Sequence, residues 1–110
     1  MKREQAPSYP VSIFVAGDVR DAERSCRAYC NEIGLCVTVT PTNYIYTGGS
    51  QSGVIVGLIN YPRFPSDPGA IFAKAEALAM RLIAELYQES ATIQAPDKTV
   101  WISFREGEAA

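Results

Sequence analysis

The chain has 110 residues, the size of one domain, so an enzyme with separate cofactor and substrate lobes is excluded. Hydrophobic residues make up 47% and charged residues 20% of it, a composition that forms a core and disfavours disorder. Ten Lys and Arg against twelve Asp and Glu give a net charge of −2. A DNA or RNA duplex is therefore excluded as a partner, whereas a small anionic ligand needs only one or two arginines.

The sequence contains no histidine and three cysteines. The lack of histidine excludes Ser-His-Asp and Cys-His catalysis and histidine-ligated metals. The odd cysteine count is typical of a reducing compartment, so we expect a cytoplasmic protein. Cys26 and Cys30 share a helix face and are expected to be structural. Because a fourth soft ligand is missing, no metal and no cofactor are predicted.

The two ends of the chain differ in composition from its middle. Residues 1–10 are polar with two prolines and predict a mobile N-terminal arm, and residues 106–110 predict a C-terminal tail. Residues 11–105 form the expected single domain. No apolar stretch approaches the roughly 20 residues of a membrane span, so no membrane partner is expected.

The first half of the domain predicts strand, helix and a split strand. Residues 11–16 (VSIFVA) are β-branched and aromatic and predict a strand. Asp18 is a suitable N-cap for an amphipathic helix over residues 19–33, which Gly34 would end. Residues 35–40 alternate as a half-buried strand, which Pro41 is expected to end or bend.

The second half predicts a hairpin, a second helix and two short strands. Residues 43–47 resume the extended pattern. Residues 48–53 have the composition of a hairpin loop, and residues 54–60 predict the strand that returns from it, at a central place in the sheet. Asp67 and Pro68 begin a helix that runs to about Glu89. Residues 91–94 and 99–104 are the last strands. The order β-α-β-β-α-β-β predicts an α+β fold with two helices on one face of a mainly antiparallel sheet.

A proline-rich segment after the central strand is the first candidate site. Residues 60–65 (NYPRFP) hold two prolines, which would present Arg63 on a stiff loop. A guanidinium binds phosphate in a bidentate manner, and a neighbouring ring can stack on a base or sugar. We therefore predict ligand contacts from Asn60, Tyr61, Arg63 and Phe64. The alternative is an ordinary connection whose aromatic rings pack on the helix.

Two further segments carry candidate ligand contacts. Asn43 and Tyr46 precede a glycine pair whose backbone amides could approach a phosphate, although the segment is not a Walker motif. Trp101 and Arg105 on the last strand could bracket an adenosine-sized ligand. The alternatives are an ordinary glycine-rich turn and a contact between subunits.

Catalytic machinery is not apparent in the residues. The aspartates at positions 18, 21, 67 and 97 are explained as helix caps or turn residues, and the Ser and Cys residues have no base beside them. No pair of carboxylates stands out. The sequence therefore predicts binding without turnover and no enzyme.

Four segments resemble the phage Thoeris anti-defence sponge family: residues 14–18 (FVAGD), 36–40 (CVTVT), 44–49 (YIYTGG) and 53–65 (GVIVGLINYPRFP). The resemblance spans roughly residues 11–105. It implies an antiparallel sheet with two helices, assembled as dimers or hexamers with pockets at subunit contacts. It further implies that the protein sequesters, without cleaving it, a cyclic nucleotide signal such as glycocyclic ADP-ribose, with cyclic oligonucleotides as further ligands, in the host cytoplasm.

The residues by themselves leave other functions open. One is a small enzyme of nucleotide metabolism, and another is a protein-interaction inhibitor without a small ligand. A homo-oligomer is expected in addition, because Tyr44, Tyr46 and Trp101 lie on strands whose faces the two helices need not reach.

Overall fold

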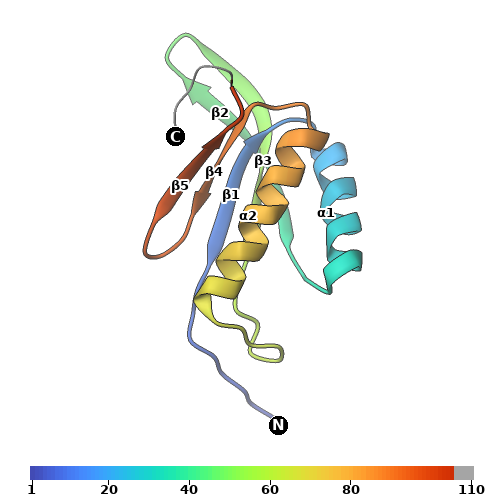
Figure 1. Ribbon diagram of the computed structural model, residues 1–110, viewed down its shortest axis with the longest axis vertical. Coiled ribbons are helices and arrows are strands. Elements are labelled where there is room, and N and C mark those ends of the chain that lie inside the picture. Colours follow the sequence, from blue (N-terminus) through green and yellow to red (C-terminus); the bar gives the residue numbers. More distant parts are fainter. Residues whose placement is uncertain (106–110) are drawn as a thin grey trace.

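A computed structural model describes residues 1–105 and shows a five-stranded sheet with two helices on one face (Figure 1). The elements are β1 (Val11–Ala16), α1 (Val19–Ile33), β2 (Thr38–Tyr46), β3 (Gly49–Leu58), α2 (Pro68–Glu85), β4 (Ser90–Gln94) and β5 (Thr99–Ser103). Every strand pairing is antiparallel. The predicted α+β fold and its element order are therefore confirmed.

Strand β1 lies at the centre of the sheet, whose order is β2-β3-β1-β4-β5. Alternate side chains of β1, namely Val11, Ile13 and Val15, point to the helices and are almost fully buried. They meet the apolar stripe of α2, which buries Leu78 and Leu82 completely. The core thus lies between the sheet and the helices, because each element contributes one apolar face.

Local signals set the ends of the helices. The Asp18 side chain accepts hydrogen bonds from the backbone amides of Arg20 and Asp21, and Gly34 adopts a left-handed conformation that ends α1. Asp67 caps α2, with proline in its first turn. The helix ends at Glu85 and not near Glu89, because the chain turns back through a left-handed residue soon afterwards.

The hairpin differs from its prediction in two respects. β2 continues through Pro41, which was expected to end or bend the strand. Since β2 is an edge strand, a missing amide donor is tolerated there. The six residues expected as the loop mostly belong to β3, and Tyr46 pairs with Gly49, so Thr47 and Gly48 alone form the turn. The hairpin therefore projects well beyond the helices (Figure 1).

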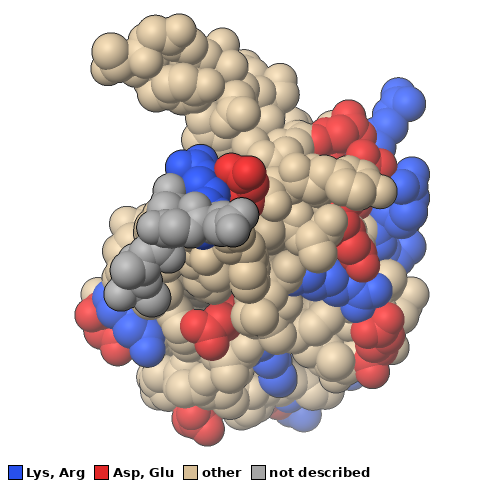
Figure 2. Space-filling model, turned by 45° about the horizontal axis from the view of Figure 1, so that its top comes forward, with Lys and Arg blue, Asp and Glu red and all other residues tan. Residues whose placement is uncertain are grey.

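The sheet face away from the helices carries no charged side chain over three cross-strand rows. One row runs Thr40, Ile55, Phe14, Thr92 and Trp101 across all five strands. The neighbouring rows contain Thr, Ser, Gln, Gly and Ala. Figure 2 shows that the charged side chains of that view gather on the body of the molecule and leave the projecting lobe bare. We call the surface formed by these three cross-strand rows the open sheet face.

Two observations concern the chain ends and membranes. Tyr9 is buried and its hydroxyl donates to Asp97, so the predicted arm is attached at that point, and its mobility stays a prediction. The predicted C-terminal tail lies outside the described residues. None of the helices described is long and apolar enough to cross a membrane.

Candidate functional site

Two pockets lie at opposite ends of the sheet. The first, which we call the loop pocket, has a volume of about 820 Å³ and lies where β3 ends, between the segment after α1 and the segment before α2. The second, the hairpin pocket, has a volume of about 450 Å³ and lies beside the base of the β2–β3 hairpin and the turn after α2. Both volumes fall in the range of small-molecule sites.

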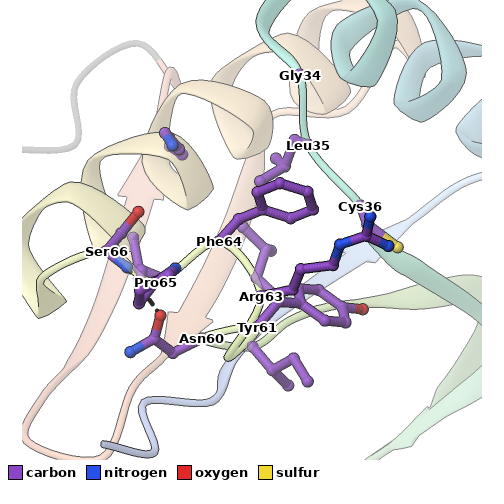
Figure 3. Close-up of a pocket in the computed structure, with 13 residues that line it drawn as sticks. Gly34, Leu35, Cys36, Asn60, Tyr61, Arg63, Phe64, Pro65 and Ser66 are labelled. Carbon is purple, nitrogen blue, oxygen red and sulfur yellow. Dashed lines mark hydrogen bonds between the residues drawn. The ribbon is translucent and has the colours of Figure 1, made fainter. Parts of the chain in front are cut away.

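The loop pocket is built on a segment held by Asn60. Its side-chain amide donates to the Pro7 carbonyl at 2.9 Å, and its oxygen accepts from the Ser66 amide at 2.9 Å. These bonds fix both ends of the proline-rich loop and leave Phe64 projecting into the pocket opposite Leu35 (Figure 3). The expected stiffness of this loop thus has a physical cause in the Asn60 amide as well as in the prolines.

Cations and hydrogen-bond donors supply the polar groups of the loop pocket. The Arg63 guanidinium lies 5.4 Å from the centre of the Phe64 ring and extends toward Cys36 (Figure 3). Lys74 contributes a second cation from α2, and no carboxylate of the described part of the chain, residues 1–105, lines the pocket. A hydrogen bond with the Cys36 thiol, together with burial, raises the pKa of Tyr61. The Tyr61 hydroxyl therefore stays protonated and able to donate at neutral pH.

The hairpin pocket holds both signs of charge and several neutral polar groups. Glu89, after α2, accepts a 2.9 Å ion-pair hydrogen bond from Arg105, which follows β5. The Tyr44 hydroxyl donates to the Val54 carbonyl, and its ring lies over Gly53, where a Cβ would come within 2.4 Å of a ring carbon. Gln51 faces Tyr44 across the β2–β3 ladder. Glycine at position 53 thus lets the Tyr44 ring lie flat against the sheet.

Tyr87 at the edge of the hairpin pocket has an unusual backbone. Its φ is 56°, in the left-handed region that side chains other than glycine rarely adopt, and its ring is 94% exposed. The conformation ends α2, since the Gln88 amide donates to the Ile83 carbonyl at 2.9 Å. Glycine would meet this need with less strain, so the exposed ring at this position is a candidate ligand contact.

The structure divides the predicted site residues into separate groups. Asn60, Tyr61, Arg63 and Phe64 come together in the loop pocket, and Arg105 lines the hairpin pocket. The two arginines thus lie at opposite ends of the sheet, and one chain does not bring them to one ligand. The remaining three lie in neither pocket. Asn43 and Tyr46 are exposed on the hairpin, and Trp101 is half exposed on the open sheet face.

Sequence reasoning missed the residues that the other elements bring to each pocket. Leu35, Cys36 and Lys74 complete the loop pocket, whereas Tyr44, Gln51 and Glu89 complete the hairpin pocket. Glu89 carried no local signal, because its role depends on Arg105, which pairs with it from 16 residues away. Gly53 carried no clear signal either, because it was expected in the hairpin loop, where glycine is ordinary.

The cysteines lie together but differ in exposure. All three are free, with Cys26 buried, Cys30 partly buried and Cys36 exposed. Burial raises the pKa of the Cys26 thiol to about 11, so it is inert at neutral pH. Within residues 1–105, no group of three or more His, Cys, Asp or Glu side chains is placed to hold a metal ion.

No protein-family model matches the chain, and no sequence among curated proteins matches it. Two solved structures share its fold. A phage SAM lyase in the apo state superposes with a TM-score of 0.81 at 18% identity, over 98% of both chains. A phage SAM lyase in complex with S-methyl-5'-thioadenosine gives a TM-score of 0.69, also at 18% identity and over 98% of both chains. At this identity the likeness shows the fold.

The comparison corrects the functional expectations. The proteins that share the fold are phage proteins, as the resemblance implied, but they are named as an enzyme that acts on SAM. The prediction of a Thoeris sponge that binds a cyclic nucleotide without cleaving it is therefore wrong, and so is the prediction that the chain is no enzyme. The absence of histidine does not exclude an enzyme of this kind, because cleaving a sulfonium needs no proton on the leaving thioether. The alternative of a small enzyme of nucleotide metabolism is favoured instead.

Proposed function

We propose that this chain is an enzyme that cleaves S-adenosylmethionine (SAM) in the hairpin pocket and releases S-methyl-5'-thioadenosine. The observation that carries the proposal is the match of 98% of the chain to a phage SAM lyase, which has also been captured with S-methyl-5'-thioadenosine. We infer a phage protein that acts in the host cytoplasm, in keeping with its free cysteines.

The charge of the substrate selects the hairpin pocket over the loop pocket. SAM carries a sulfonium and an ammonium against one carboxylate, so it requires a carboxylate or an aromatic face nearby. The hairpin pocket offers Glu89 and the rings of Tyr44 and Tyr87, with Arg105 on the same rim for the substrate carboxylate. The loop pocket offers cations without a carboxylate and would repel the sulfonium.

The reaction itself places few demands on the chain. When the carbon–sulfur bond breaks, its electron pair stays on sulfur, which leaves as a neutral thioether without a general acid. The carbon then gains an electron pair from the substrate's own carboxylate, which closes a lactone, or from a neighbouring C–H bond whose proton passes to a base. Among residues 1–105, Glu89 is the carboxylate that lines the hairpin pocket, where it is available as that base or as a counter-ion to the sulfonium.

A homo-oligomer accompanies this proposal. The three rows of the open sheet face lack charge and leave half of Trp101 exposed, and Tyr46 is half exposed on the same side of the hairpin. Exposed apolar patches of this kind mark contacts. A second copy packed on the open sheet face would cover these side chains and close the hairpin pocket on its solvent side. Light scattering at micromolar concentration tests this, and a monomer mass would contradict it.

Product analysis tests the enzymatic proposal. Purified protein incubated with SAM should yield S-methyl-5'-thioadenosine by liquid chromatography and mass spectrometry, and the four-carbon product distinguishes lactone closure from proton loss. S-adenosylhomocysteine is the matched control, because its uncharged sulfur would have to leave as a thiolate, a poor leaving group, and it should stay intact. Unchanged SAM after prolonged incubation with folded protein would contradict the proposal.

A further inference from the structure

We propose that the loop pocket is a second binding site, separate from the hairpin pocket, for a small molecule with an apolar body and a single anionic head. The cavity of about 820 Å³ is the larger of the two, and the cleavage of SAM proposed above does not use it. The inference goes beyond that function and does not depend on it.

The cations of the pocket determine the charge of the ligand. Arg63 and Lys74 both line the cavity, and neither makes an ion pair with a carboxylate of residues 1–105. By contrast, Arg24, Arg81 and Arg105 are each paired with a carboxylate. Because both cations line the same cavity, an anionic group bound there would be attracted to them.

The neutral groups of the pocket are arranged to suit the same ligand. The Tyr61 hydroxyl and the Cys36 thiol are hydrogen-bonded to each other, which leaves one of their two protons for a ligand, while the oxygen of Asn60 is already bonded to the Ser66 amide. The walls consist mainly of apolar side chains, including Leu35, Phe64 and Ile71. An apolar body would be buried against these walls, with the anionic head directed to Arg63 and Lys74.

Calorimetry with shaped probes tests the charge requirement. We expect 2-naphthoate and 2-naphthyl phosphate to bind, and neutral 2-naphthylmethanol to bind at least tenfold more weakly. The carboxylate and the phosphate differ in head group alone, so the tighter of the two identifies the head that the site prefers. Equal affinity of the anionic and neutral probes, or no binding of either anion, would overturn the proposal.

Variants and thiol labelling test the location. Arg63→Ala and Lys74→Ala should each weaken the anionic probes about tenfold or more, whereas Arg27→Ala, on the exposed side of α1, should not. Bound probe should also slow the alkylation of Cys36, measured by mass spectrometry, because this thiol lines the pocket and is the exposed one. Unchanged melting temperatures would exclude misfolding of the variants. Unchanged affinity in both pocket variants would overturn the site.

Competition distinguishes this proposal from the enzymatic one. SAM should not displace the anionic probe, and the probe should bind equally well when S-methyl-5'-thioadenosine is present. Displacement by SAM would make the loop pocket the substrate site and overturn the second-site proposal, while product formation would still report on the enzymatic proposal by itself.

Discussion

The pockets at the two ends of the sheet differ both in volume and in the charge of the side chains that line them. The loop pocket is larger and apolar, with two cations, whereas the hairpin pocket is smaller and brings Glu89 and Arg105 together. Volume alone would select the loop pocket as the active site. The sulfonium of the proposed substrate would favour the other pocket, because a cation buried beside two cations has no compensation. The charge of the expected ligand and the size of the cavity thus favour different pockets, and the proposed function follows the charge.

The difference arises from the elements that meet at each end. Two loops and the first turns of α2 surround the loop pocket, and such segments present backbone donors and long cationic side chains. The hairpin pocket lies where β1 and β4 reach the edge of the body, next to the left-handed turn at Tyr87. Its polar groups therefore come from strands and from one strained turn, a frequent location of functional residues.

The largest effect is expected from removing the carboxylate of the hairpin pocket. Glu89→Gln keeps the shape of the side chain and removes its charge, so formation of S-methyl-5'-thioadenosine should fall by about 100-fold or more. The melting temperature should change little, since exposed ion pairs contribute roughly 0–1 kcal/mol. Glu32→Gln, which also breaks an ion pair but lies in neither pocket, is the matched control. A normal rate in Glu89→Gln would remove this carboxylate from the reaction.

Introducing a charged side chain on the open sheet face, which lies between the two pockets, would test whether a second copy of the chain packs there. Trp101→Asp should weaken self-association by about 30-fold or more, the effect of losing an interface hot spot of about 2 kcal/mol. Sedimentation or light scattering measures the change. Arg27→Asp, on the exposed side of α1, should leave the oligomer intact. An unchanged subunit count in Trp101→Asp would place the contact elsewhere.

The strained turn at the hairpin pocket should show opposite effects on stability and substrate affinity. Tyr87→Gly relieves the left-handed conformation and should raise the free energy of unfolding by about 1 kcal/mol. Loss of the ring should raise KM for SAM roughly fivefold, if the ring stacks on the nucleoside with about 1 kcal/mol. Tyr87→Ala separates the two effects, because it removes the ring without relieving the backbone. An unaltered KM in both variants would exclude the ring from the site.

The smallest effect concerns the alkaline stability of the core under α1, which buries Cys26. The pKa of Cys26 is raised from 9.0 to about 11 by burial, so below pH 9 both the folded and the unfolded chain hold the thiol proton. Between pH 9 and 11 the unfolded chain loses the proton first, and stability should decrease as the pH rises. Cys26→Ala should show a shallower decrease in urea unfolding over this window. Parallel pH profiles would contradict the assignment.

Some features of this protein were determined locally and could be read from the sequence. The caps Asp18 and Asp67 and the ending glycine at position 34 placed both helix starts and one helix end correctly, because capping depends on neighbours in the chain. The apolar stripe of α2 and the alternation in β1 also indicated which face each element buries, which is sufficient to predict two helices on one sheet face.

The tertiary structure alone decided the remaining features. Pro41 continues a strand because β2 lies at the sheet edge, and no local pattern reports strand order. Arg63 and Arg105 looked equivalent as arginines beside aromatic residues, yet the fold places them at opposite ends and gives only Arg105 a carboxylate partner. The physical reason is that capping and periodicity act over a few residues, whereas a binding site combines side chains whose separation in the sequence carries no information about their distance in space.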